Sequence, residues 1–67
     1  MKYNIKEGDI VLYISQTRVE AGRVTMIIRE KDHFRIVPLE KGHHVKKRKE
    51  SELLPLKKVI ELSKQFG

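Results

Sequence analysis

The sequence predicts a small, mostly β domain of four to five antiparallel strands that ends in a short C-terminal helix. Four runs rich in β-branched and aromatic residues follow one another from residue 10 onward, and short segments containing Gly, Asp or Pro separate them. After the last run, apolar residues recur at the spacing of one helix face. The chain has 67 residues, a length that suits a single domain spanning residues 1–67.

The first two strands are predicted at residues 10–14 and 23–29. Gly and Asp within residues 6–9 are typical of a turn before the first strand. The run 10–14 is apolar with little alternation, which predicts a buried, central strand. Residues 15–20 are polar and are expected to form a loop. Alternation along the second strand predicts an inward face of Val24, Met26 and Ile28 and an outward face of Arg23, Thr25, Ile27 and Arg29.

The third strand is predicted at residues 33–39, after a tight connection at residues 30–32. Alternation turns Phe34 and Ile36 inward and Arg35 and Val37 outward. Pro38 has no N–H to donate, so the strand either ends there or lies at an edge. Ile27 and Val37 share the outward face, and we expect them to pack under the C-terminal helix, with a dimer contact as the alternative.

A hairpin turn at residues 40–42 is predicted to lead into a fourth strand at residues 43–49. Val45 is the clear candidate for a core position in that strand. Because side chains alternate, the opposite face would then carry His44, Lys46 and Arg48.

The end of the chain is predicted to form a short helical turn at residues 50–55 and then a helix. Val59, Leu62 and Phe66 recur at positions i, i+3 and i+7, the spacing of one helix face. A rival prediction is a short fifth strand at residues 57–61. Both predictions hold if a brief strand precedes the helix.

The positive charge of the chain is concentrated in one segment. The chain has 15 Lys and Arg against 9 Asp and Glu, a net charge of +6. Residues 41–49 contain five basic residues and no acidic one, and so contribute +5 of that total: Lys41, Lys46, Lys47, Arg48 and Lys49. Such a local excess indicates an anionic partner. The alternative is a solvated edge strand, where lysine discourages pairing with another chain.

Composition and motifs disfavour several functional classes. The absence of Cys excludes a disulfide framework and a cysteine zinc site. No apolar run reaches the roughly 18 residues of a membrane span, and we expect a cytoplasmic protein with no membrane partner. His43 and His44 would point to opposite faces of a strand, so no metal site is predicted. Without a nucleophile motif or a glycine-rich phosphate loop, we expect no enzyme and no cofactor.

The residues also resemble a recurrent pattern of SH3-like small β-barrels. The pattern is Gly-Asp-x-Val at the first strand, Gly-x-Val at the second, a third strand, a hairpin turn, a fourth strand and a Leu-x-Pro turn. It occurs here as Gly8-Asp9-Ile10-Val11-Leu12, Gly22-Arg23-Val24, Phe34-Arg35-Ile36-Val37, Gly42 and Leu53-Leu54-Pro55-Leu56. This is similar to KOW motifs, to Tudor-type barrels and to the C-terminal DNA-binding domain of retroviral-type integrases. The resemblance implies a barrel over residues 6–56, with residues 57–67 forming a C-terminal helix or a short strand plus a tail.

Among these families, the residues favour the basic type that contacts nucleic acid. A Tudor domain that binds methylated side chains needs an aromatic cage, and this chain has no Trp and few other aromatic residues. A signalling SH3 domain binds proline-rich peptides with an aromatic groove, and residues 15–20 contain no aromatic residue. The resemblance to KOW and integrase domains implies contact with nucleic acid or a nucleoprotein machine, without catalysis.

The sequence therefore predicts a small basic nucleic-acid-binding module with a regulatory or accessory role. The expected contacts are to the phosphate backbone, with double-stranded DNA favoured over RNA. The candidate contact residues are Lys46, Lys47, Arg48 and Lys49, assisted by Lys41, His44, Arg23 and Arg35. Tyr13 is a weaker candidate for stacking on an unpaired base.

The alternative function is a protein-interaction module that docks on a larger nucleic-acid-handling machine and modulates it. The apolar stripe of Val59, Leu62 and Phe66 distinguishes the two predictions. An exposed stripe would favour protein docking, and a stripe buried on the sheet would favour nucleic-acid binding. In either case we expect a monomer or a weak homodimer.

Overall fold

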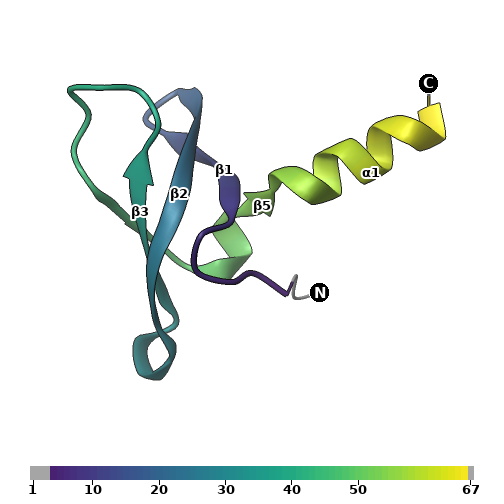
Figure 1. The fold of residues 1–67 in the computed structure, drawn as a ribbon. Helices are drawn as coiled ribbons and strands as arrows, with labels where there is room; N and C mark the ends of the chain where they lie inside the picture. The colour runs from purple at the N-terminus through teal and green to yellow at the C-terminus, as the bar shows by residue number, and fades with distance from the viewer. Residues whose placement is uncertain (1–3, 67) are drawn as a thin grey trace.

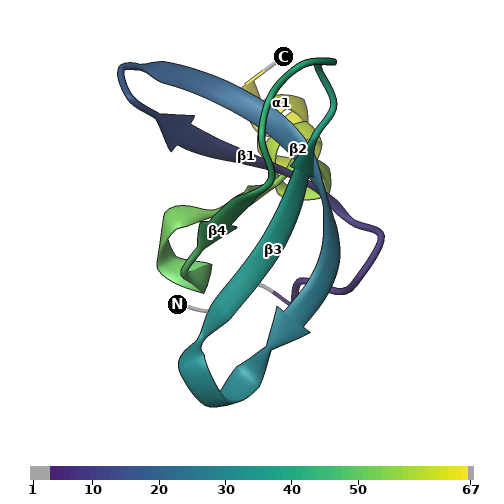
Figure 2. The same ribbon diagram turned by 90° about the vertical axis from the view of Figure 1, so that its left-hand side faces the viewer.

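The computed structural model describes residues 4–66, which form one curled antiparallel sheet followed by a helix (Figures 1 and 2). The strand order is β4-β3-β2-β1-β5, and the sheet stays open because the edge strands β4 and β5 do not pair with each other. The elements are β1 (Ile10–Ser15), β2 (Arg18–Ile28), β3 (His33–Pro38), β4 (Lys46–Arg48), β5 (Leu54–Pro55) and α1 (Leu56–Phe66), with 3-10 turns at Arg29–Lys31 and Glu50–Glu52. The predicted mostly β fold with a C-terminal helix is confirmed.

β1 and β2 form a hairpin with a two-residue turn, so the loop predicted at residues 15–20 is wrong. Ser15 pairs with Arg18, and Gln16 in the turn has a φ of 60°, in the left-handed region. The polar residues that suggested a loop belong to β2, which starts at Arg18 rather than at residue 23. Pairing with β1 on one side and β3 on the other makes β2 the central strand.

A β-bulge in β2 reverses the faces predicted for its second half. Val24 pairs with Ile36, whereas Met26 pairs with the adjacent Arg35, so one residue of β2 has no partner. Met26 is consequently 46% exposed, and Ile27 packs against the core. The predicted inward position of Met26 and outward position of Ile27 are therefore wrong, because one extra residue shifts the alternation of side chains by one.

β3 forms as predicted, whereas β4 is much shorter than predicted. In β3 the even-numbered residues Phe34 and Ile36 are buried, Arg35 is exposed, and the strand ends at Pro38. Of the predicted fourth strand, only three residues pair with β3, and residues 39–45 form an irregular loop. Val45 lies in that loop and is 43% exposed, so its predicted core position is wrong.

The core lies on the concave side of the sheet and draws residues from β1, β2, β3 and the segments that flank the sheet. Its buried apolar members are Ile5, Val11, Tyr13, Val24, Phe34, Ile36 and Leu53. Gly22 is buried among them, and a Cβ at this position would collide with the side chain of Ile36. The close approach of β2 and β3 therefore requires glycine at this point.

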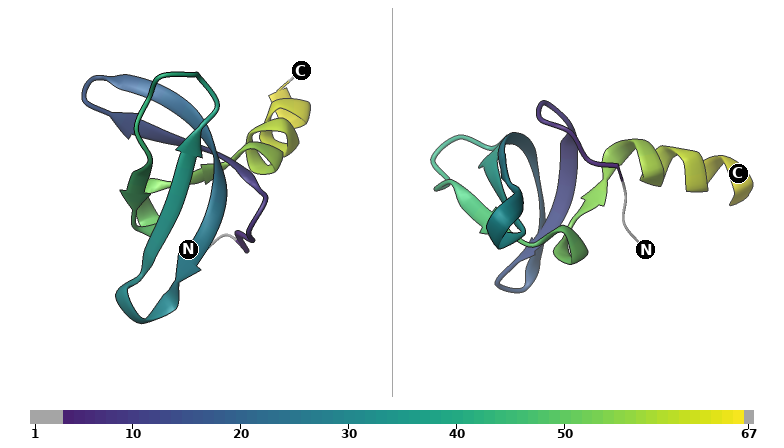
Figure 3. Two further views of the ribbon diagram at one scale, coloured as in Figure 1. Left: turned by 60° about the vertical axis from the view of Figure 1, so that its left-hand side comes forward. Right: turned by 90° about the horizontal axis from the view of Figure 1, so that it is seen from below.

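α1 projects away from the sheet instead of covering it (Figures 1 and 3). The brief strand β5 runs directly into the helix. The predicted C-terminal helix is confirmed, and the rival strand at residues 57–61 does not form. No residue of α1 is buried. Ile27 and Val37 do not lie under the helix as predicted: Ile27 joins the core, and Val37 is exposed.

Candidate nucleic-acid interface

The basic residues of β4 are divided between the two faces of the sheet. Directly opposite residues of an antiparallel pair share a face, and Lys46 and Arg48 lie opposite the buried residues of β3. Both side chains therefore extend on the core side, and both are half-buried. The prediction that they share an outward face with His44 is wrong, because Val45 does not anchor the strand. The exposed Lys47 is the residue of β4 that faces outward.

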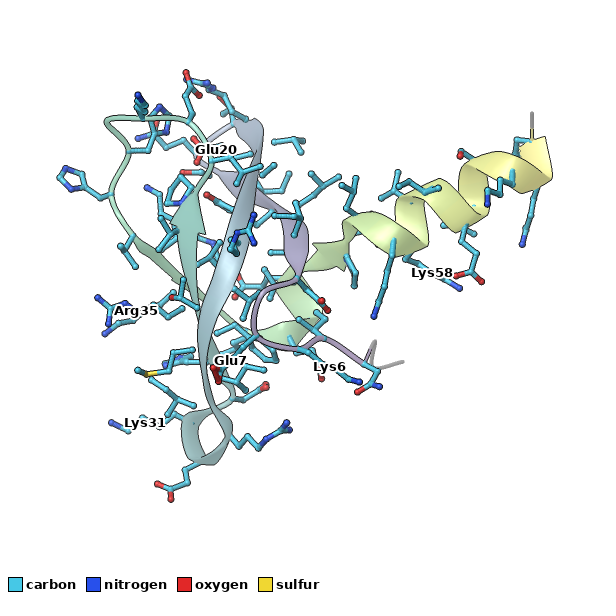
Figure 4. The ribbon with its side chains drawn as sticks, in the orientation of Figure 1. Lys6, Glu7, Glu20, Lys31, Arg35 and Lys58 are labelled. Atoms are coloured by element: carbon cyan, nitrogen blue, oxygen red, sulfur yellow. The ribbon has the colours of Figure 1, made fainter. Side chains whose placement is uncertain are left out.

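The convex side of the sheet carries three exposed basic residues on three adjacent strands: Arg23 of β2, Arg35 of β3 and Lys47 of β4, here named the outer basic row. Arg35 and Lys47 are directly opposite each other. Like charges in such a cross-strand pair destabilise a sheet, and a bound anion would relieve their repulsion. The side chain of Arg35 points away from the molecule on the side opposite α1 (Figure 4).

Arg48 has a structural role on the concave side. Its Nη2 donates a hydrogen bond to the backbone oxygen of Ile14 on β1 at 3.2 Å, and its Nη1 donates to the backbone oxygen of Lys47 at 2.9 Å. The guanidinium carbon lies 5.5 Å from the centroid of the Tyr13 ring, within the range of a cation–π contact. Arg48 thus links the edge strand β4 to β1 across the open sheet, and it is only partly free to bind a ligand.

Tyr13 is buried beneath this contact, which removes it as a base-stacking residue. Its hydroxyl donates a hydrogen bond to Oε1 of Glu20 at 3.2 Å. Burial, followed by the interaction with the Glu20 carboxylate, raises the pKa of the Tyr13 phenol above its ordinary value. The phenol therefore stays neutral and acts as a structural donor inside the sheet.

Three other predicted contact residues lie at the ends of β4. Lys41 and His44 are exposed on the loop of residues 39–45. Lys49 is exposed where β4 ends, and its backbone N–H donates to Oε1 of Glu52 at 2.8 Å. The ammonium groups of Lys41 and Lys49 are thus at the surface, but neither residue belongs to the ordered row formed by β2, β3 and β4.

The loop of residues 39–45 is attached to the sheet by His43, a contact that the sequence analysis missed. Nδ1 of His43 lies 3.3 Å from Oε2 of Glu20 on β2, and Nε2 lies 3.5 Å from Oε2 of Glu40. Arg18 extends the cluster, with Nη2 3.7 Å from the same oxygen of Glu40. The sequence contained no signal for this cluster, because Glu20 was assigned to a loop and His43 to a strand.

Within residues 4–66, the acidic side chains that form ion pairs contact basic residues outside the predicted interface. The carboxylates of Glu20 and Glu40 contact His43 and Arg18, and those of Asp9 and Glu61 contact lysines of α1. Over the same residues, none of the eight predicted contact residues forms an ion pair with an acidic side chain: Arg23, Arg35, Lys41, His44, Lys46, Lys47, Arg48 and Lys49. The fold therefore leaves these side chains without an acidic partner at ion-pair distance.

In the described part of the chain, no group of three or more His, Cys, Asp or Glu side chains could hold a metal ion. No helix among residues 4–66 is both long and apolar enough to cross a membrane. Comparison of the chain with models of protein families, with curated proteins and with solved structures produced no match.

Proposed function

We propose that the chain is a small, non-catalytic module of the SH3-like type that binds the phosphate backbone of nucleic acid through the outer basic row. The observation that carries this proposal is the directly opposite placement of Arg35 and Lys47, with no acidic partner for either among residues 4–66. A sheet that keeps two like charges side by side loses stability unless an anion binds them. The exposed residues Lys41, His44 and Lys49 would extend the positive surface near this row.

The geometry favours a backbone, and a duplex in particular, over an unpaired base. Arg35 and Lys47 lie on neighbouring strands about 4.8 Å apart, and Arg23 lies beside Val37, two residues along β3 from Arg35, so the row presents its charges as a short patch that can contact a phosphate backbone. Tyr13 and Phe34 are buried, so neither can serve as a stacking platform for unpaired bases. Double-stranded DNA is the expected ligand, ahead of RNA, and a regulatory or accessory role suits a module without catalytic groups.

The test is a binding titration with duplex DNA, single-stranded DNA and RNA at two salt concentrations. Three phosphate contacts predict a slope of log K against log salt of about −2.7 for a duplex. The double variant Arg35→Ala/Lys47→Ala should reduce duplex affinity at low salt at least tenfold and make the slope shallower by about 2. Arg48 is left unchanged in this test, because it has a structural role.

The matched control is Lys6→Ala/Lys31→Ala, which removes the same charge from two exposed positions outside the row (Figure 4). Its affinity for the duplex should fall less than that of the row variant, because only the overall charge changes. Equal losses in the two double variants would refute the assignment of the site to the row. The proposed function itself fails if none of the three nucleic acids binds at low salt.

A second candidate function, protein interaction, is favoured by the exposure of α1. In the sequence, the stripe of Val59, Leu62 and Phe66 is the feature that separates the two functions. None of these three side chains is buried, and Phe66 is 88% exposed. A protein contact at α1 and a nucleic-acid contact at Arg35 are compatible, because Arg35 lies on the side of the molecule away from α1 (Figure 4).

A further inference from the structure

Residues 4–66 leave much of the apolar face of α1 uncovered. The apolar side chains of the helix lie on one side, here named the α1 stripe: Leu56, Val59, Ile60, Leu62 and Phe66. Phe66 is 88% exposed and Ile60 49% exposed. An isolated helix of 11 residues is only marginally stable in water, so α1 needs a surface on which the stripe can pack.

A second uncovered apolar surface lies on β1, β2 and β5. Ile14 and Val19 are directly opposite each other in the β1–β2 pair and are 58% and 65% exposed. Together with Leu12, Leu53 and Leu54 they line a groove of about 380 Å³, here named the β1–β2 groove. Contiguous exposed apolar surface of this kind is characteristic of an interaction site.

The α1 stripe does not cover the groove of its own chain. β5 ends at Pro55 and α1 begins at Leu56, so no loop residue is available to turn the helix back. Lys57 also fixes the first turn of the helix, with Nζ 3.7 Å from Oδ2 of Asp9 and 3.5 Å from the backbone oxygen of Asn4. The helix therefore points away from the strands of the sheet (Figure 3).

We propose that two copies of this chain form a two-fold symmetric dimer in which α1 of each copy packs its stripe into the β1–β2 groove of the other. The convex apolar face of α1 and the apolar β1–β2 groove are complementary in shape and chemistry. A two-fold axis places the helix of each copy in the groove of the other, so both helices and both grooves are covered. Phe66, the most exposed apolar side chain of the helix, is the expected anchor in the groove.

The expected size of the contact indicates a weak dimer. A helix of 11 residues is about 16 Å long and about 10 Å wide, so two such contacts, counted on both partners, bury on the order of 600 Å² in total, well below the standard range for stable complexes. Glu52 borders the groove and Lys64 lies on the polar side of α1, which permits an ion pair between the copies. Arg23 of the outer basic row lies on the same face of the sheet as Ile14 and Val19, four residues further along β2 from Val19, so the contact and the row are separated along the strands.

The inference goes beyond the proposed function, and its test needs no nucleic acid. Sedimentation equilibrium of the full chain should give the mass of a dimer at about 200 μM and that of a monomer at about 2 μM. Phe66→Glu should weaken association at least tenfold, whereas Gln65→Glu, which adds the same charge at the neighbouring exposed position, should weaken it less than about threefold. For the groove, Val19→Glu should likewise weaken association at least tenfold, and its control Thr17→Glu should weaken it less than about threefold.

Disulfide trapping establishes which surfaces meet, because the chain has no cysteine of its own. A mixture of Ser63→Cys and isotope-labelled Val19→Cys chains should give a mixed disulfide on mild oxidation. Ser63→Cys mixed with Lys31→Cys, at the far tip of the sheet, should not. A monomer at every concentration would overturn the proposal. Preferential linkage of Ser63→Cys to itself would also overturn it, because that result places α1 against α1.

Discussion

Replacing Arg48 with alanine is expected to destabilise the fold as well as to remove a positive charge. The guanidinium links β4 to β1 through its hydrogen bond to the backbone oxygen of Ile14, and it lies over the Tyr13 ring. β4 pairs with β3 through three residues only, so this side-chain link is a large part of what holds the edge strand in place.

The magnitude follows from these contacts. A hydrogen bond from a charged group to a partly exposed acceptor contributes about 1 kcal/mol. The cation–π contact adds about 0.5–1 kcal/mol at a site of this exposure. The hydrogen bond to the backbone oxygen of Lys47 joins neighbouring residues and adds little. The free energy of unfolding should therefore fall by about 1.5–2 kcal/mol, which lowers the Tm of a domain this small by about 10 °C.

The assay is thermal and urea unfolding of Arg48→Ala, Arg48→Lys and Lys47→Ala, followed by circular dichroism. Lys47→Ala removes the same charge one residue away from an exposed side chain, and its free energy of unfolding should stay within about 0.5 kcal/mol of the original. Arg48→Lys keeps the charge without the planar guanidinium group, and its free energy of unfolding should lie between those of Arg48→Ala and Lys47→Ala. Equal midpoints for Arg48→Ala and Lys47→Ala would refute the structural role of Arg48.

Three further predictions concern the sheet. Gly22→Ala should cost about 3 kcal/mol or prevent folding, because the new methyl group would sit 2.9 Å from the backbone oxygen of Val37, which cannot move aside; a denaturation midpoint within error of the original would contradict this. Ile27→Ala should destabilise the fold by about 2 kcal/mol and Met26→Ala by less than about 0.5 kcal/mol, and the reverse order in urea unfolding would show that the bulge is misplaced. Burial raises the pKa of Tyr13, so the folded phenol stays neutral above about pH 10 while the unfolded phenol ionises, and stability should fall as the pH rises through that range. An absorbance titration of the chain and of Tyr13→Phe checks this, and a Tyr13 ionisation at or below pH 10 would contradict it.

The local pattern of the sequence was sufficient for most of the secondary structure. Alternation alone placed Phe34 and Ile36 inward, Pro38 marked the end of β3, and helical spacing identified α1. These predictions succeeded because each depends on a period or a backbone restriction that acts within a few residues. The turn at residues 6–9 also formed, because Gly8 supplies the positive φ that it requires.

The predictions that failed depend on pairing between distant residues. The sequence does not show that Met26 pairs with Arg35 in β3. The bulge in β2, and the inward position that it gives to Ile27, were therefore not predictable. Likewise, Val45 lies in a loop, and Lys46 and Arg48 face the core side because β4 takes its register from β3. One residue of register decides the face of every side chain in a strand.

The candidate site shows the same division between sequence and tertiary structure. The sequence by itself determined that the excess positive charge lies in residues 41–49, and it favoured an amphipathic helix after residue 55 with a short strand at residues 57–61 as the rival. Only the tertiary structure decided which of those charges share a surface: it pairs Lys47 with Arg35 on the convex side and commits Arg48 to β1. It also decided that α1 leaves the sheet with its stripe uncovered. The reason is physical, because composition and periodicity are local properties of the chain, whereas the grouping of charges and the covering of an apolar face depend on which distant segments pair.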